Sequence, residues 1–169
     1  MWGRAKGRIP AQEFANGLML LLQPRPSDKE YVDESGAERN RFLLELFYLR
    51  LFCLLHVIGN LFPEKIRHAV YDNVIPRAVS LVSTYVESDD EDKPDFLRDI
   101  VERWSAYEKA LQDTKAKTPL WPLGEAFAGF CEMPEEVHVG LIGVALWADF
   151  CDEDTKAIKE ILKKNEVVQ

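Results

Sequence analysis

The chain has 169 residues, of which 47% are hydrophobic and 30% are charged. This composition is typical of a folded, soluble domain and is too apolar for an intrinsically disordered chain. The net charge of −8 argues against a nucleic-acid partner, because binding to phosphates requires concentrated Lys and Arg side chains.

The N-terminal region begins with a basic arm at residues 1–8. A first helix is predicted from Pro10 to the prolines at positions 24 and 26, with one apolar face formed by Phe14, Leu18, Leu21 and Leu22. Because the apolar stretch is short and no cleavage site follows it, we do not interpret it as an export signal. Residues 24–37 are rich in Pro, Ser, Asp and Gly, which predicts a loop.

The most apolar segment of the chain is predicted to form one long helix over residues 38–60. Its length would suffice to cross a bilayer, but Glu45, Arg50 and His56 would each be costly in lipid. We therefore expect no transmembrane segment. We interpret this helix as the buried axis of a soluble bundle, because a helix this apolar must be covered on most sides.

Helical periodicity continues after Pro63, which suits the first position of a helix. This helix is predicted to reach about Tyr85, with a kink or break at Pro76, which lacks a backbone donor. An acidic connection follows at residues 87–95, in which Asp92 is the expected cap of the next helix. The apolar stripe of that helix is formed by Phe96, Leu97, Ile100, Val101, Trp104, Tyr107 and Leu111.

The C-terminal third is predicted to hold three more helices and a short tail. Their expected ranges are 123–132, 134–150 and 152–165, with the tail at 166–169. Gly140 and Gly143 are expected to allow close contact with Ala126, Ala128 and Gly129 of the preceding helix. The whole pattern predicts an all-α fold: a single-domain irregular bundle over residues 9–165, with about seven to eight helices around the central helix.

Polar residues on the central helix form the first candidate site. At 100° per residue, one stripe carries Arg41, Glu45, Tyr48, His56 and Asn60, while Arg50 stands among apolar residues. One interpretation is a polar pocket or partner groove that uses Glu45, Tyr48, Arg50 and His56. The interpretation that we favour is an internal hydrogen-bond network, with Arg50 bound to an acidic partner or reaching water.

Three pairs of residues have a spacing that suits metal ligation on one helix face: Glu135 with His138, Glu64 with His68, and Cys53 with His56. A di-iron bundle needs a second Glu-x-x-His motif and further carboxylates, which the sequence lacks. We favour the interpretation that Glu64 and Glu135 are first-turn charges. No metal and no cofactor is therefore predicted.

The three cysteines have apolar neighbours and share no Cys-x-x-Cys spacing. This predicts reduced, buried thiols in a cytoplasmic protein. Apolar surroundings raise the pKa of a thiol, so catalysis by a cysteine nucleophile is not favoured. The sequence also lacks a Gly-rich phosphate loop and a Gly-x-Ser-x-Gly motif, so it favours a protein that is not an enzyme without deciding the question.

The segment from Tyr48 to Phe52 and a stretch of Pro, Glu and His near the C-terminus resemble short stretches of all-helical maturation chaperones. The paired motif that such chaperones carry is absent, so no residue role is taken from them. The favoured hypothesis is a non-catalytic helical interaction protein: an adaptor, regulator, chaperone or assembly factor. Its partner would be another protein or a second copy of the chain.

Two other hypotheses remain open. The first is a small helix-bundle metal protein or enzyme that uses the Glu/His pairs. The second, which the sequence favours least, is contact with a membrane surface through the basic arm and the apolar face from Leu18 to Leu22. Aromatic residues in or near loops or terminal helices support the interaction hypothesis, because they are common in interfaces; they are Trp2, Phe14, Tyr31 and Trp121.

Overall fold

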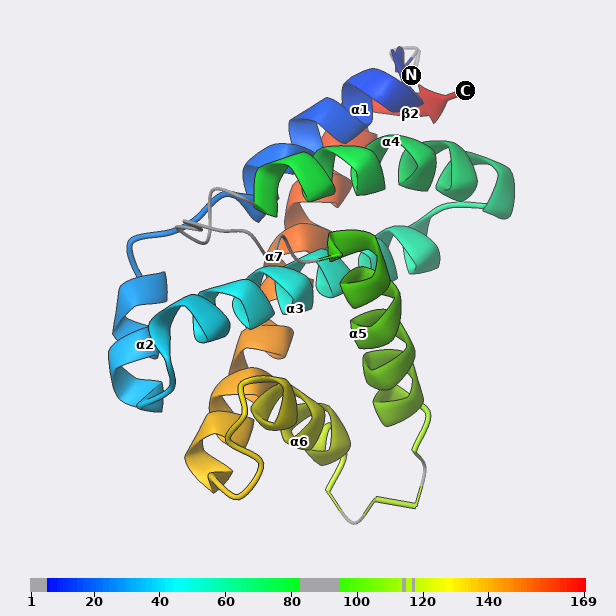
Figure 1. Ribbon diagram of the computed structural model, residues 1–169. Helices are drawn as coiled ribbons and strands as arrows, with labels where there is room; N and C mark the ends of the chain where they lie inside the picture. The colour runs from blue at the N-terminus through cyan, green and yellow to red at the C-terminus, as the bar shows by residue number, and fades with distance from the viewer. Residues whose placement is uncertain (1–5, 83–94, 114, 117) are drawn as a thin grey trace.

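The computed structural model describes residues 6–82, 95–113, 115–116 and 118–169. Residues 1–5 of the predicted arm and residues 83–94, which include most of the acidic connection and Asp92, lie outside the described residues. The described part is an all-α bundle, as predicted (Figure 1). Its elements are β1 (Gly7–Pro10), α1 (Ala11–Leu18), the 3₁₀ helix η1 (Met19–Leu22), α2 (Asp28–Ser35), α3 (Arg39–Leu61), α4 (Glu64–Val82), α5 (Phe96–Leu111), α6 (Trp121–Phe130), α7 (Val137–Lys164) and β2 (Asn165–Val168).

Helix α3 is the central helix that the sequence predicts. The Glu38 carboxylate caps it by accepting hydrogen bonds from the backbone N–H groups of Asn40 and Arg41. It ends where Phe62 becomes extended before Pro63. Among the described helices, α3 is the one that is long and apolar enough to cross a membrane. In its most apolar 18-residue stretch, 83% is buried inside the protein. Core helices of soluble proteins meet the same criterion.

Residues 24–37 contain helix α2, so the predicted loop is wrong. The residues that suggested a loop delimit this short helix instead. Asp28 lies in its first turn and accepts a hydrogen bond from the backbone N–H of Arg25. Gly36 ends the helix in the left-handed conformation, with a φ of 68°, which costs glycine little.

Two predicted breaks are also absent. Helix α4 continues through Pro76, and the Arg77 side chain donates to the nearby carbonyl of Asn73. Helix α7 continues through residues 150–152, where two helices were predicted. Asp152 does not cap a new helix, because its carboxylate pairs with Lys156 one turn further along the same helix.

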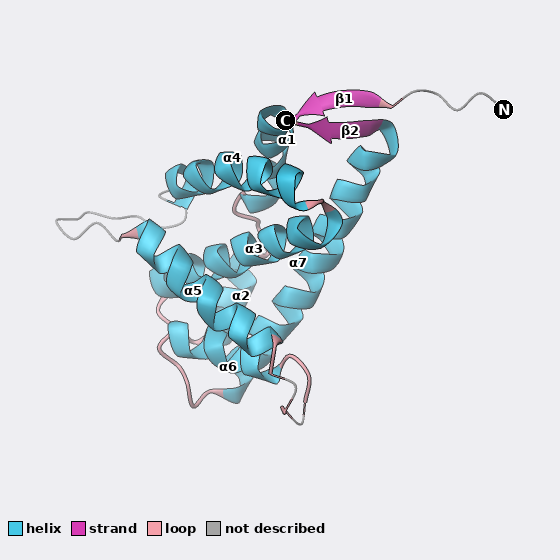
Figure 2. Ribbon diagram, turned by 90° about the vertical axis from the view of Figure 1, so that its right-hand side faces the viewer, coloured by secondary structure: helices cyan, strands magenta, loops and turns pink. Residues whose placement is uncertain are grey.

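The core has two parts, one on each side of α3 (Figure 2). One part packs α3 against α1, η1 and α4, and the other packs it against α5, α6 and the first half of α7. Helices α6 and α7 approach closely where Gly124 faces Gly140: a Cβ on Gly124 would lie 2.5 Å from the Gly140 oxygen. The predicted close contact at Gly140 is therefore present, with Gly124 as its partner rather than Ala126, Ala128 or Gly129.

Strands β1 and β2 form a parallel pair that the sequence did not predict. Gly7 lies opposite Asn165, and Pro10 lies opposite Val168. Lys6 supports the pair by donating to the carbonyl of Leu162 at 2.7 Å. Strands of four residues are too short to show a period of two, which explains the omission. The pair brings residues of the predicted arm beside residues of the predicted tail.

Candidate functional site

Glu45 of the predicted polar stripe forms an ion pair with Arg103 of α5. The Arg103 Nε and Nη2 atoms donate to the two carboxylate oxygens at 3.0 and 2.5 Å. Burial raises the pKa of Glu45, although Arg103 opposes this effect. Burial also disfavours the charge on Arg103, but the hydrogen bonds that it donates to Glu45 outweigh this effect and raise the pKa of Arg103. The guanidinium lies over the rings of Tyr48 and Phe130, so the pair is enclosed.

Tyr48 belongs to the same internal network. Its hydroxyl donates to Asp99 of α5 at 3.3 Å. Burial raises the pKa of this hydroxyl, and the negative charge of Asp99 adds to the effect. Glu45 and Tyr48 therefore contact partners inside the protein, and their polar groups are not presented to an open pocket.

Arg50 lies on another side of α3 and binds Asp28 of α2. Its Nη2 atom lies 3.0 Å from one carboxylate oxygen, and Nη1 donates to the carbonyl of Gln23 at 3.2 Å. The guanidinium also stacks over the ring of Phe150, 4.5 Å from the centroid. Both charged side chains are almost completely buried. Arg50 thus has the acidic partner that its burial requires, and it anchors α2 and the 3₁₀ turn to α3.

His56 and Asn60 are stripe residues that line a hollow. The hollow has a volume of about 300 Å³ and lies between the second half of α3 and α7. The imidazole packs against Trp147 at 5.2 Å between centroids, and burial lowers the pKa of His56. Among the residues that the structure describes, no Asp, Glu, Lys or Arg lines this hollow; the lining residues are His56, Val57, Asn60, Leu61, Trp147, Cys151 and Thr155.

The cysteines are free thiols. Cys53 and Cys131 are buried, and burial raises the pKa of both, so neither is suited to act as a nucleophile. Cys151 is half-buried and contributes to the hollow beside His56.

The predicted metal pairs do not form a site in the described part of the chain. No group of three His, Cys, Asp or Glu side chains there is placed to hold a metal ion. His138 instead joins α7 to α2, because its Nε2 atom lies 3.0 Å from the carbonyl oxygen of Ser35. Its Nδ1 atom faces Glu136, and Glu135 is exposed. Glu64 and His68 lie exposed at the start of α4.

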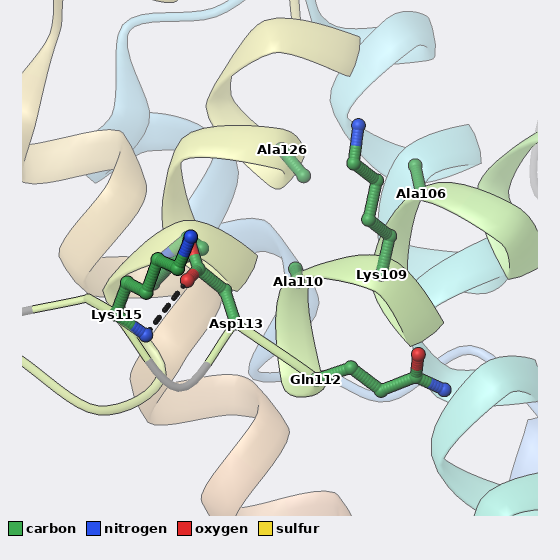
Figure 3. Close-up of a pocket in the computed structure, with 8 residues that line it drawn as sticks. Ala106, Lys109, Ala110, Gln112, Asp113, Lys115 and Ala126 are labelled. Carbon is green, nitrogen blue, oxygen red and sulfur yellow. Dashed lines mark hydrogen bonds between the residues drawn. The ribbon is translucent and has the colours of Figure 1, made fainter.

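A larger cavity of about 570 Å³ lies between α5 and α6 (Figure 3). Ala106 and Ala110 of α5 face Ala126 of α6 across it. Its charged lining residues are exposed at the rim, where the Lys115 backbone donates to Asp113. Because no charged or polar side chain is buried among the described residues that line it, this cavity offers little for orienting a reacting group.

Asp154 of α7 is a buried carboxyl that the sequence did not single out. It is 1% exposed, and its Oδ2 atom has no hydrogen-bond partner among the described residues. Burial raises its pKa to about 7, although the charges of Arg25 and Arg50 oppose the shift. The folded state therefore holds a proton that the unfolded chain releases near pH 3.8.

Asp154→Asn should stabilise the protein increasingly as the pH rises from 4 to 8. A carboxyl with a raised folded-state pKa contributes stability below its unfolded pKa, and that contribution is lost as the pH rises through the folded value. The expected gain at pH 8 is on the order of 2–4 kcal/mol, since one pKa unit corresponds to about 1.4 kcal/mol. Urea unfolding at several pH values measures it. Asp149→Asn, on an exposed position of α7, is the matched control, and a gain independent of pH would contradict the assignment.

The outer face of α7 carries an apolar stripe that the sequence analysis also missed. Its side chains are half-buried or exposed, with Val137 61% and Leu141 56% exposed. The buried side of the helix packs on α6 and α3. Val144 of the stripe lies at the border of that side, against Gly124 of α6. The stripe consists of Val137, Leu141, Val144, Ala148, Cys151 and Thr155, and its last two members border the His56 hollow. In the sequence, these residues follow one another at alternating intervals of four and three positions. The predicted break at Asp152 divided this pattern, so the stripe was not recognised.

Comparison with known proteins finds no match to a protein-family model, to a curated protein or to a solved structure. Two surfaces stand out in the structure: the outer stripe of α7 and the uncharged hollow next to it.

Proposed function

We propose that this protein is a non-catalytic helical interaction protein, an adaptor or assembly factor that contacts a partner helix through the outer face of α7. The observation that carries the proposal is the exposure of Val137 and Leu141 on one face of a 28-residue helix. Two exposed aliphatic residues one turn apart, continued by Val144 and Ala148, form a stripe that a helix of another molecule can cover.

The contacts of the polar candidate residues on α3 support the same proposal. Glu45, Tyr48 and Arg50 are each bound to partners inside the protein, so they act in holding the helices together. The His56 hollow adds depth to the α7 stripe, and none of its described lining residues is an Asp, Glu, Lys or Arg. An apolar surface with an uncharged hollow suits recognition of an aliphatic side chain better than acid–base chemistry. Free cysteines agree with a cytoplasmic location, which is part of the proposal.

Photo-cross-linking tests whether this face binds protein. A photoreactive phenylalanine analogue is placed at position 141 in one variant and at the exposed position 160 of the same helix in another. In cells of the source organism, the variant at 141 should give a discrete cross-linked protein band that the variant at 160 does not give. The mass of that band distinguishes a second copy of the chain from a different protein. No discrete band from position 141, or the same bands from both positions, would overturn the proposal.

A further inference from the structure

Two of the free thiols, Cys53 and Cys151, lie together where α3 packs across α7 (Figure 1). The Cys53 thiol donates to the backbone carbonyl of Trp147 at 4.0 Å. In an α-helix such a carbonyl also accepts the backbone N–H of the residue four positions later, which here is Cys151. The Cys53 sulfur therefore lies at the helical turn that carries Cys151. A hydrogen bond between the two thiols places their sulfur atoms in contact.

The two thiols differ in their access to solvent. Cys53 is completely buried in the core. Cys151 is half-buried and lines the His56 hollow, whose volume of about 300 Å³ is ample for a small polar molecule. The His56 imidazole and the Thr155 hydroxyl line the same hollow and can form hydrogen bonds with such a molecule. A small reagent can therefore reach the pair of thiols through Cys151.

Burial gives the two thiols different reactivities. Burial, and next the hydrogen bond with Cys151, raise the pKa of Cys53, so this thiol is unsuited to attack a molecule that arrives from solvent. Attack on the neighbouring sulfur is different, because the two atoms are already in contact and no diffusion is needed. An accessible cysteine with a second thiol poised beside it is the usual arrangement of a redox-sensing pair.

We propose that Cys53 and Cys151 form a hydroperoxide-sensitive pair that closes to a disulfide between α3 and α7. First, the Cys151 sulfur takes the terminal oxygen of a hydroperoxide. The O–O bond breaks, Cys151 becomes a sulfenic acid, and the hydroperoxide is reduced to water or an alcohol. Second, the Cys53 sulfur attacks the sulfenic sulfur, and the Cys53 proton leaves with the hydroxyl group as water.

The electrons balance between the thiols and the oxidant. The two thiols lose two electrons in forming the S–S bond, and the hydroperoxide accepts both when its O–O bond breaks. Reduction by an external dithiol restores the two free thiols by thiol–disulfide exchange. The inference goes beyond the proposed interaction function and does not depend on it.

Peptide mass spectrometry of the purified, folded protein after treatment with a small excess of hydrogen peroxide tests the pair. The wild-type protein should lose two hydrogen atoms and give a cross-linked peptide that joins Cys53 to Cys151 within one molecule. Dithiothreitol should reverse the change. Cys131→Ala, which removes the other buried thiol, is the matched control and should leave the cross-link unchanged. A wild-type protein without this cross-link, or one in which Cys131 is cross-linked as often, would overturn the proposal.

Two further variants test which thiol reacts first. In Cys53→Ala the sulfenic acid on Cys151 cannot be resolved, so dimedone, which traps sulfenic acids, should label Cys151. In Cys151→Ala the folded protein should carry no label on Cys53, because Cys53 is buried. Circular dichroism checks that both variants keep the helical fold. Label on Cys53 in Cys151→Ala, or no label on Cys151 in Cys53→Ala, would contradict the assigned order.

Discussion

Glu45→Ala is expected to lower the free energy of unfolding by about 3–5 kcal/mol, because it leaves the guanidinium of Arg103 buried without its counter-ion. Arg103 is only 7% exposed, and Glu45 accepts two of its hydrogen bonds. Asp99 and Glu102 also lie within 4 Å of this arginine, but through its Nη1 atom on the less buried side. They cannot replace the paired contact that Glu45 makes with the other two nitrogens.

Urea unfolding at pH 7 measures this loss, and a double variant shows its origin. Removing both charges with Glu45→Met and Arg103→Leu should recover most of the stability, since a buried ion pair exchanged for apolar side chains costs little. Glu160→Ala, which removes an exposed pair with Lys163, should leave the free energy of unfolding close to that of the wild-type protein. A double variant that is as unstable as Glu45→Ala would show that packing, and not the stranded charge, causes the loss.

Asp28→Ala is the second substitution with a large expected effect: it should lower the free energy of unfolding by about 3 kcal/mol. The substitution removes the carboxylate that binds Arg50, which is 1% exposed, and the acceptor of the Arg25 backbone N–H. Arg50 keeps its bond to the Gln23 carbonyl and its stacking on Phe150, which limits the loss. Because Asp28 begins α2, we also expect faster hydrogen exchange in that helix than in α3.

Asp33→Ala is the matched control, since Asp33 lies on the same helix and is exposed. It should leave both the unfolding free energy and the exchange of α2 within experimental error of the wild-type protein. Equal losses from Asp28→Ala and Asp33→Ala would mean that the helix is sensitive to any substitution. That result would remove the special role assigned to the pair with Arg50.

The elements with long apolar periodicity could be predicted from the sequence. The central helix was placed within one residue of α3, and Arg50 was expected to have an acidic partner or to reach water. The partner itself was not identified, because Asp28 lay in a segment interpreted as a loop. Arg103 was not singled out from the sequence, because it lies outside the apolar stripe of its helix. The Arg50–Asp28 pair joins residues 22 positions apart, and the Arg103–Glu45 pair joins residues 58 positions apart. Local sequence patterns contain no information about which helices meet.

The candidate surface on α7 was missed for a different reason. Asp152 is a good capping residue, so a helix start was predicted there and the apolar stripe was divided into two short parts. The continuous spacing from Val137 to Thr155 is evidence against such a break, since a capped start would shift the apolar face. Hydrophobic spacing across a suspected boundary is therefore a stronger indicator of a continuous helix than the residue at the boundary.

The pairing of β1 with β2 has a consequence for how the domain forms. Lys6 and Leu162, which meet beside this pair, are separated by 156 positions along the chain, so the pair cannot nucleate folding at a reasonable entropic cost. It can form readily only after the helices between them have brought the two segments together. Formation of the strand pair is therefore expected to be the last stage of folding. The strands also define one place on the surface from which segments attached before β1 and after β2 would both emerge.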